Sequence, residues 1–166
     1  MQRTSSKPPR APGPLLVSVS FRPVWAYIDG VREFGRFYCD TTFKEPEVAA
    51  RARVVLQETI ENAIKYSSSS DDSKLEVEIS SDGSELQIST LSHVDPNHLQ
   101  SLREEIDMLR RFDPEAAFIA AFARAAREPG APARIGLARM RFESQFELQV
   151  SEESDGKVRV TAVGKL

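Results

Sequence analysis

The spacing of hydrophobic and polar positions predicts a strand and two helices in the first 67 residues. Residues 15–21 alternate apolar and polar side chains, with Val17, Val19 and Phe21 on one face, which predicts a strand. Helical spacing then continues to about Cys39, despite two glycines. Pro46 is well placed in the first turn of the next helix, about 45–67. The apolar positions that define these two helices are Trp25, Ile28, Val31, Phe34, Phe37 and Tyr38, and then Val48, Ala52, Val55, Leu56, Thr59, Ile60 and Ala63.

The middle of the chain predicts an antiparallel pair of strands. Leu75, Val77 and Ile79 alternate with polar residues in the first strand. Asp82-Gly83 is a hairpin turn signal, and residues 85–90 form the returning strand.

The remainder predicts three helices and two strands. Leu99, Leu102, Ile106 and Leu109 mark the first of these helices. Asp113-Pro114 begins the second helix, and a short third helix begins at Gly136. Residues 146–152 and 157–164 form the last strands, joined near Asp155-Gly156. The residues expected on the inner side of the second helix are Phe118, Ile119, Phe122 and Ala126.

This order of elements predicts an α+β fold. One strand, two helices, two strands, three helices and two strands fit a two-layer sandwich, with a mainly antiparallel sheet and helices on one face. Residues 1–14 hold four prolines and almost nothing to bury, and we predict a disordered basic tail there. Residues 15–166 are then a single domain.

Composition and charge exclude several classes of function. The net charge of −3 gives no indication of nucleic-acid binding. Cys39 is the only cysteine, so no internal disulfide forms, and no Cys/His pair has zinc-ligand spacing. The apolar run at 15–21 is too short for a membrane span or a signal-peptide core. We therefore expect a cytoplasmic protein without membrane or nucleic-acid partners.

The helix at 45–67 carries a stripe of polar residues that has two interpretations. Glu58, Asn62 and Lys65 cluster within about 60° of one another on a helical projection, away from the apolar face. Such a stripe is commonly a solvated helix face. It is also an arrangement in which a carboxylate and an amide one turn apart point into the same space.

The motif Glu58-x-x-x-Asn62-Ala63-x-Lys65-Tyr66 resembles the N box of the histidine-kinase-like (GHKL) ATPase superfamily. Two strands follow this helix, as that family requires. Within the superfamily, the chain is most similar to small bacterial regulators akin to anti-sigma-factor serine kinases. The resemblance implies the histidine-kinase-like ATPase fold, with an unrelated α+β domain as the alternative.

The resemblance also implies roles for these residues. The Asn62 amide would bind Mg²⁺ through a bound nucleotide, Glu58 would accept a proton from an attacking hydroxyl or water, and Lys65 would neutralise phosphate charge. The implied cofactors are ATP and Mg²⁺.

Two glycine-containing boxes of the family are altered here. Where the family has D-x-G-x-G, this chain has Thr90 or Ser92 in place of the adenine-binding aspartate, with Asp95 as a late substitute. The G-x-G-L box is half kept, with Arg134 replacing its first glycine and Gly136 retained. Arg134 and the helix entered at Gly136 could contact phosphate, but a single glycine before a helix is also an ordinary turn residue.

These departures favour a degenerate relative. We expect a bacterial signalling regulator with weak or lost ATP binding that acts mainly through protein–protein contacts. The alternative is an active ATP- and Mg²⁺-dependent serine kinase of a partner-switching pathway. The implied partner is a signalling protein, namely a sigma factor, an anti-sigma antagonist, a kinase or a response regulator, with a homodimer as a further option.

Overall fold

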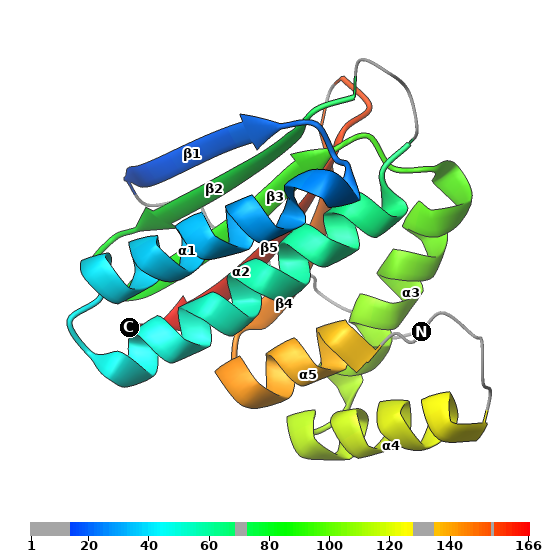
Figure 1. Ribbon diagram of the computed structural model, residues 1–166. Coiled ribbons are helices and arrows are strands. Elements are labelled where there is room, and N and C mark those ends of the chain that lie inside the picture. Colours follow the sequence, from blue (N-terminus) through cyan, green and yellow to red (C-terminus); the bar gives the residue numbers. More distant parts are fainter. Residues whose placement is uncertain (1–13, 69–72, 128–134, 154) are drawn as a thin grey trace.

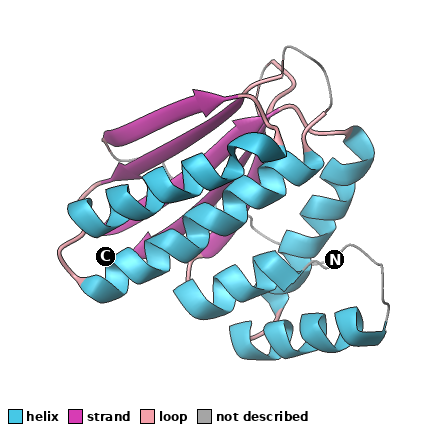
Figure 2. Ribbon diagram, viewed as in Figure 1, coloured by secondary structure: helices cyan, strands magenta, loops and turns pink. Residues whose placement is uncertain are grey.

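The computed structural model describes residues 14–68, 73–127, 135–153 and 155–166. Its elements follow the predicted order (Figures 1 and 2). They are β1 (Leu15–Phe21), the 3₁₀ turn η1 (Trp25–Tyr27), α1 (Ile28–Thr42), α2 (Pro46–Tyr66), β2 (Leu75–Ser81), β3 (Glu85–Ser92), α3 (Pro96–Arg111), α4 (Pro114–Arg127), α5 (Ile135–Ser144), β4 (Glu147–Glu152) and β5 (Val158–Lys165).

The sheet is antiparallel throughout, which confirms the predicted α+β class. Its five strands lie in the order β1-β2-β3-β5-β4. The Asp82-Gly83 turn joins β2 to β3, and Gly83 has a φ of 89°, a conformation that glycine adopts without strain. The final hairpin, β4–β5, adds its second strand beside β3, so the middle and the end of the chain form one sheet.

The helices cover one face of this sheet (Figure 1). Val55 and Ile60 of α2 are buried in the same core as Val77, Ile79 and Ile88 of the central strands. Gly35 of α1 is buried against Leu56, at a place where a Cβ atom would lie 2.3 Å from the Leu56 Cδ2. A side chain at this position would force Leu56 to move, so Gly35 lets α1 pack closely on α2.

The opposite face of the sheet is polar. Arg159 on β5 pairs with Glu78 on β2 and with Glu153, the latter at 3.0 Å, and also donates to the Ser89 hydroxyl at 3.1 Å. These cross-strand contacts agree with a face that no helix covers.

Arg141 of α5 fixes the end of α3. Its guanidinium donates to the carbonyl oxygens of Leu109 and Phe112, the latter at 2.8 Å, and lies 3.7 Å from Glu147. The side chain is buried. Because the last carbonyls of a helix have no partner within the helix, Arg141 supplies the missing donors and ties α3, α5 and β4 together.

Two predicted inner faces are wrong in part. On α4 the buried residues are Ala117 and Ala121, whereas Ile119, Phe122 and Ala126 are exposed. In η1 and α1, Trp25, Phe34 and Phe37 are exposed, and Ile28, Gly35 and Cys39 are the buried positions. Both segments carry apolar residues on more than one side, so their periodicity does not define a single inner face.

Two further expectations from the sequence concern the N-terminal tail and a membrane span. The predicted tail lies, apart from Pro14, outside the described residues. Among the described residues, no helix has the length and apolar character needed to span a bilayer.

Candidate functional site

The candidate site lies where α2 meets α5. Glu58 and Asn62 are on the side of α2 that faces Gly136, the second residue of α5. The α2 helix places them one turn apart, because a residue four positions along lies on nearly the same face. Of the two interpretations of the polar stripe, a solvated face is wrong for Glu58, since this residue is only 8% exposed.

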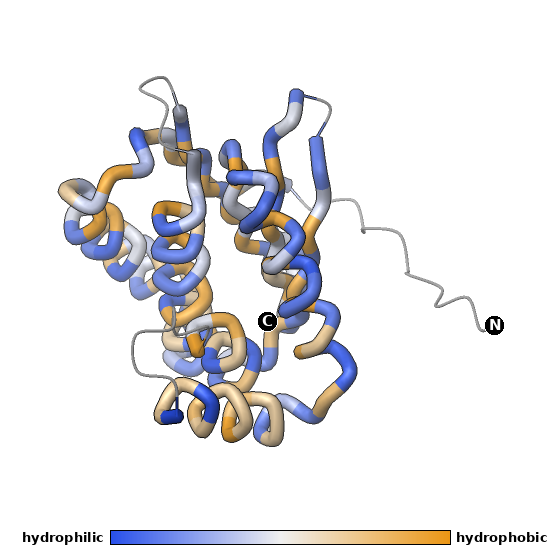
Figure 3. The backbone as a smooth tube through the Cα atoms, turned by 90° about the vertical axis from the view of Figure 1, so that its right-hand side faces the viewer, coloured by the Kyte–Doolittle hydropathy of each residue, from blue (hydrophilic) through white to orange (hydrophobic). Residues whose placement is uncertain are grey.

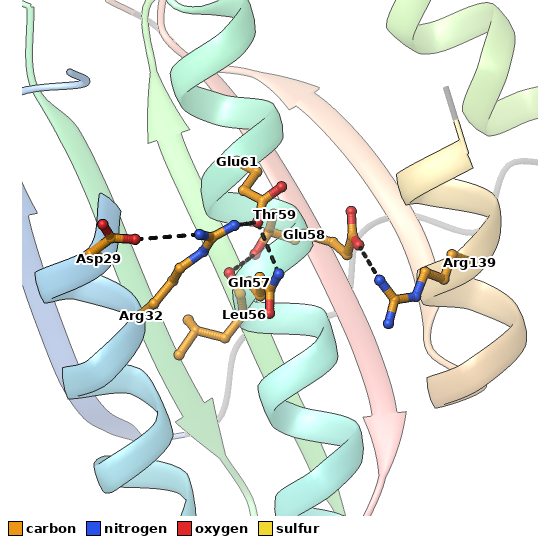
Figure 4. Close-up of polar contacts among 8 residues, drawn as sticks. All are labelled: Asp29, Arg32, Leu56, Gln57, Glu58, Thr59, Glu61 and Arg139. Carbon is orange, nitrogen blue, oxygen red and sulfur yellow. Dashed lines mark hydrogen bonds and ion pairs between the residues drawn. The ribbon is translucent and has the colours of Figure 1, made fainter. Parts of the chain in front are cut away.

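The Glu58 carboxylate points from α2 toward α5 (Figure 4). Its Oε1 lies 3.4 Å from Nη1 of Arg139, and Arg139 also pairs with Glu143, its neighbour one turn along α5, at 2.9 Å. Arg139 is itself partly exposed. Glu58 therefore has a charged partner at the surface while its own carboxylate is shielded from water.

Burial raises the pKa of the Glu58 carboxyl above its ordinary value. The nearby negative charges of Glu61 and Glu143 act in the same direction, and the guanidinium groups of Arg139 and Arg32 oppose it. A carboxylate with a raised pKa holds a proton more readily, which suits a group that accepts a proton from a hydroxyl or water.

We expect Glu58→Gln to make the domain more stable than wild type at neutral pH. Because the folded-state pKa of Glu58 is raised, its contribution to stability is complete below the unfolded pKa and is lost as the pH rises through the folded pKa. Glutamine keeps the shape without the charge. Urea unfolding of both proteins at several pH values should show the advantage of the variant growing from acid to neutral pH.

Glu33→Gln is a control variant whose stability should change in the opposite direction. Its exposed carboxylate pairs with Arg36, which lowers its pKa. This variant should lose a little stability at neutral pH and none in acid. A Glu58→Gln advantage that does not change with pH would contradict the assigned environment of Glu58.

The Asn62 amide faces the same helix. Its Nδ2 atom is buried and has no hydrogen-bond partner among the described residues. A buried amide without a partner costs free energy, so it is uncommon unless another group binds there. Asn62 is thus half-buried rather than on the solvent side of α2.

Gly136 lies against Glu58 and Asn62. A Cβ atom at this position would lie 2.3 Å from Oε2 of Glu58 and 3.6 Å from Nδ2 of Asn62. The absence of a side chain lets the backbone of α5 lie directly on the two polar groups. The glycine therefore belongs to the packing of this site, and an ordinary turn is not its only role.

Lys65 lies apart from this pair. It is exposed near the end of α2, with its Nζ 5.2 Å from the ring centroid of Tyr66. On the other side of α2, Glu61 pairs with Arg32 of α1 and accepts from Gln57 at 3.0 Å (Figure 4). Polar groups on α2 thus connect it to both neighbouring helices.

Thr90 and Ser92 are buried in the sheet, and Asp95 caps a helix. Thr90 and Ser92 are each 3% exposed, and they alternate with Ser89 and Leu91 so that they lie on the helix-covered side of β3. Asp95 accepts a hydrogen bond from the Asn97 backbone N–H at 2.8 Å and caps α3. Arg134 lies outside the described residues.

Sequence reasoning missed Arg139 and the shielding of Glu58. Arg139 lies one turn after Gly136, so its place on the same helix face was the available signal.

Cys39 is buried, and burial raises the pKa of its thiol to about 11, which makes it an unreactive part of the core. The described residues contain no cluster of three or more His, Cys, Asp or Glu side chains that could hold a metal ion.

Comparison with known proteins identifies a similar fold. No family model matches the sequence, and no curated protein matches it. A chain from the crystal structure of the SiaB–SiaC complex of Pseudomonas aeruginosa is similar, with a TM-score of 0.65 and 19% sequence identity. The similarity covers 92% of this chain and 91% of that chain, so the two share the α+β architecture over almost their whole length.

Proposed function

We propose that this protein is a signalling regulator that acts mainly through contacts with other proteins, on a domain related to the histidine-kinase-like ATPases. The observation that carries the proposal is an exposed group of aromatic residues on η1 and α1, formed by Trp25, Tyr27, Phe34 and Phe37 and called here the α1 aromatic patch. The similar chain comes from a complex of two proteins, which supports a role in protein contacts.

The α1 aromatic patch has the composition of a protein-binding surface. Trp25 is 56% exposed and Phe37 is 66% exposed, so both keep most of their apolar surface in water. Tryptophan and tyrosine are over-represented among the residues that dominate binding energy at interfaces. Phe34 and Phe37 lie one turn apart on α1, and two large exposed aromatic side chains in one turn favour a docking site.

Nucleotide binding, in this proposal, is weak or lost. The Asn62 amide would supply one hard oxygen atom of the kind that Mg²⁺ prefers, and nucleotide phosphates and water would complete its coordination. However, Gly136 lies directly on both residues, and Arg139 already pairs with Glu58. A nucleotide would have to displace these contacts, and the hydroxyls of Thr90 and Ser92, which stand in place of a carboxylate, are buried.

An active serine kinase is the second candidate. The raised pKa of Glu58 favours it, because proton acceptance is the task that the family resemblance assigns to this position. The unpartnered Nδ2 of Asn62 is a hydrogen-bond donor, which suits an acceptor such as a phosphate oxygen. In that case Glu58 would accept the proton of a partner serine hydroxyl, and Asn62 would orient the metal-bound phosphates. ATP and Mg²⁺ would supply the transferable phosphoryl group.

A photo-crosslinking amino acid at position 37 tests the protein-contact proposal. Incorporated in the living bacterium, it should give a discrete covalent adduct with another protein. Phe37→Ser should weaken binding of that partner by about tenfold or more, since a central aromatic anchor contributes more than about 1.4 kcal/mol. The melting temperature should hardly change, because Phe37 is exposed.

Leu166 is the matched control position, since it is also an exposed apolar residue but lies outside the α1 aromatic patch. A crosslinker there should give no adduct with the same protein. Equal adducts at both positions, or none at position 37, would contradict a specific docking site at the α1 aromatic patch.

A further inference from the structure

The two edges of the sheet differ in how they are protected from pairing with a further strand. The edge strand β4 begins at Glu147 and ends at Glu152. Both carboxylates pair with arginines of the helices, Glu147 with Arg141 at 3.7 Å and Glu152 with Arg103 at 2.8 Å. The other edge strand, β1, has no charged residue and no proline over its seven positions. Because natural proteins protect free edge strands with charges or proline, the bare edge of β1 indicates that another strand covers it.

The side chains of β1 that face the helices are only half-buried. Val17, Val19 and Phe21 alternate on this face, and each of them is partly exposed. The residues paired with them on β2 are at most 4% exposed, and these are Ile79, Val77 and Leu75. The layer of helices therefore does not cover β1 completely, and a strip of apolar surface follows the edge of the sheet (Figure 3 shows the hydropathy along the chain).

The side of α1 nearest this edge is also apolar. Of the helices, α1 lies nearest to β1 (Figure 1). Arg32 pairs with Glu61 of α2, and Phe34, two residues further along, points about 160° away from Arg32 around the helix. Phe34 is 42% exposed and stacks on Tyr38 with the ring centroids 6.0 Å apart. Phe34 and Tyr38 thus extend the apolar strip from β1 into the layer of helices.

We propose that β1 pairs with β1 of a second copy of this chain, as antiparallel strands around a two-fold axis perpendicular to the sheet. This pairing joins the two five-stranded sheets into one continuous sheet. The helices of both copies then lie on the same face, so the two α1 helices meet above the new strand pair and bring Phe34 and Tyr38 of each copy together. One symmetric surface covers both the free strand edge and the apolar side of α1.

The pattern of β1 sets the register of this pair. Paired residues of antiparallel strands share a face, so a two-fold axis must pass through a residue that pairs with itself. The pairing of β1 with β2 has an irregularity before Val17 and is regular from Val17 to Phe21, a segment with Val19 at its middle. With the axis at Val19, each Val17 lies opposite Phe21 of the other copy. Small and large side chains are then matched along the junction.

The size of the surface favours a second copy over an isolated strand of another protein. The seven residues of β1 are about 23 Å long, and the 15 residues of α1 are about 22 Å long. Together these two layers cover on the order of 600 Å² of each copy, close to the roughly 800 Å² per partner of a standard interface. An isolated strand would cover β1 and leave Phe34 and Tyr38 exposed. We expect a dissociation constant on the order of 10 μM.

Sedimentation equilibrium of the full chain from about 1 to 300 μM tests the proposal. We expect a monomer–dimer equilibrium. Val19→Lys should weaken it by about tenfold or more, because it places two like charges directly opposite each other across the axis. Phe34→Ser should weaken it by about tenfold as well, through the loss of an aromatic contact. Val150→Lys, the same change at a half-buried valine of the other edge strand, is the matched control and should leave the association unchanged.

Cysteine substitutions test the register. Directly opposite Cα atoms in antiparallel strands are about 4.5–5.5 Å apart, a distance that a disulfide spans. Oxidation of Val19→Cys should therefore give a covalent dimer. Oxidation of Val17→Cys should give none, because its two copies would lie about 14 Å apart along the strands. The native Cys39 is buried and does not compete.

The proposal goes beyond the proposed function and is tested separately from it. Phe37 lies about 60° around α1 from Phe34, on the side away from Tyr38. Phe37→Ser should therefore change the dimerisation constant by less than about threefold, although it weakens contact with a different protein. A failed dimer leaves the crosslink at position 37 to be judged by itself.

Circular dichroism spectra should show that the variants remain folded, since Val19 and Phe34 are partly exposed. If Val19→Lys does not fold, Phe34→Ser and the two cysteine variants decide. A monomer at all concentrations would overturn the proposal, as would a dimer that Phe34→Ser does not weaken. A covalent dimer of Val17→Cys without one of Val19→Cys would overturn the pairing at Val19. In living cells, an adduct of Val19→Cys with a different protein in place of the covalent dimer would identify that protein as the occupant of the edge and would also overturn the proposal.

Discussion

Arg141→Ala is expected to destabilise the domain by about 3–5 kcal/mol, which for a chain of this size lowers the melting temperature by roughly 6–20 °C. The guanidinium is buried and donates to the carbonyl oxygens of Leu109 and Phe112 at the end of α3. Its removal leaves these two carbonyls without a donor and opens a cavity beneath α5. Each buried polar group left unpaired costs about 1–3 kcal/mol.

Two further variants separate hydrogen bonding from packing. Arg141→Met keeps most of the volume but donates no hydrogen bond, so it should recover only part of the lost stability. Arg110→Ala removes an exposed arginine from the same region of α3 and should stay within about 0.5 kcal/mol of wild type. Differential scanning calorimetry gives all three values. Arg141→Ala and Arg110→Ala variants of equal stability would contradict the role assigned to Arg141.

Asn62→Ala is expected to remove any stabilisation of the fold by Mg²⁺ and ATP. If wild type binds with a dissociation constant of about 10–100 μM, about 5 mM Mg²⁺-ATP should stabilise it by roughly 2–4 kcal/mol through mass action. In Asn62→Ala this ligand-dependent shift should fall to near zero, because the amide assigned to the metal is gone. Thermal unfolding with and without nucleotide measures the difference.

The variant itself should fold as well as wild type. The Asn62 Nδ2 atom has no hydrogen-bond partner among the described residues, so truncation leaves no other group unpaired. Gln57→Ala, on an exposed part of α2, is the matched control and should keep the full nucleotide-dependent shift. An equal shift in wild type and in Asn62→Ala would remove Asn62 from the nucleotide site.

The alternation of apolar and polar residues was enough to predict the order of the elements and the antiparallel sheet. Strands such as β2 have one buried face, and α2 has a broad apolar face, so their periods are regular. In α4 the period fails, because alanines and aromatic residues surround the helix and only packing on α5 selects Ala117 and Ala121 as the inner positions.

The candidate site was predictable in its residues but not in its environment. The spacing of Glu58 and Asn62 places them on one face of a helix in any fold. Their burial depends on α5, a helix far along the chain whose own pattern does not show which side meets α2. The sequence alone predicted Gly136 to be a turn residue or a phosphate contact. In the structure its role comes from its close approach to Glu58.

The pairing of Glu58 with Arg139 gives a physical reason for the weak nucleotide binding that we propose. The ion pair and the packing of Gly136 must both be broken before phosphates reach Asn62. In the proposed relation to the ATPases, Thr90 or Ser92 stands where the family has an adenine-binding aspartate, and the loss of that charge-assisted hydrogen bond would cost about 1.5–3 kcal/mol. A site of ordinary affinity near 1 μM would then bind at about 10–100 μM or more weakly.

A calorimetric titration of the wild-type protein with Mg²⁺-ATP tests this account most directly. The account predicts a dissociation constant of about 10 μM or weaker, down to no measurable heat. A dissociation constant of about 1 μM or tighter would contradict it, and would show that the contacts of Gly136 and Arg139 with Glu58 do not limit access to the site.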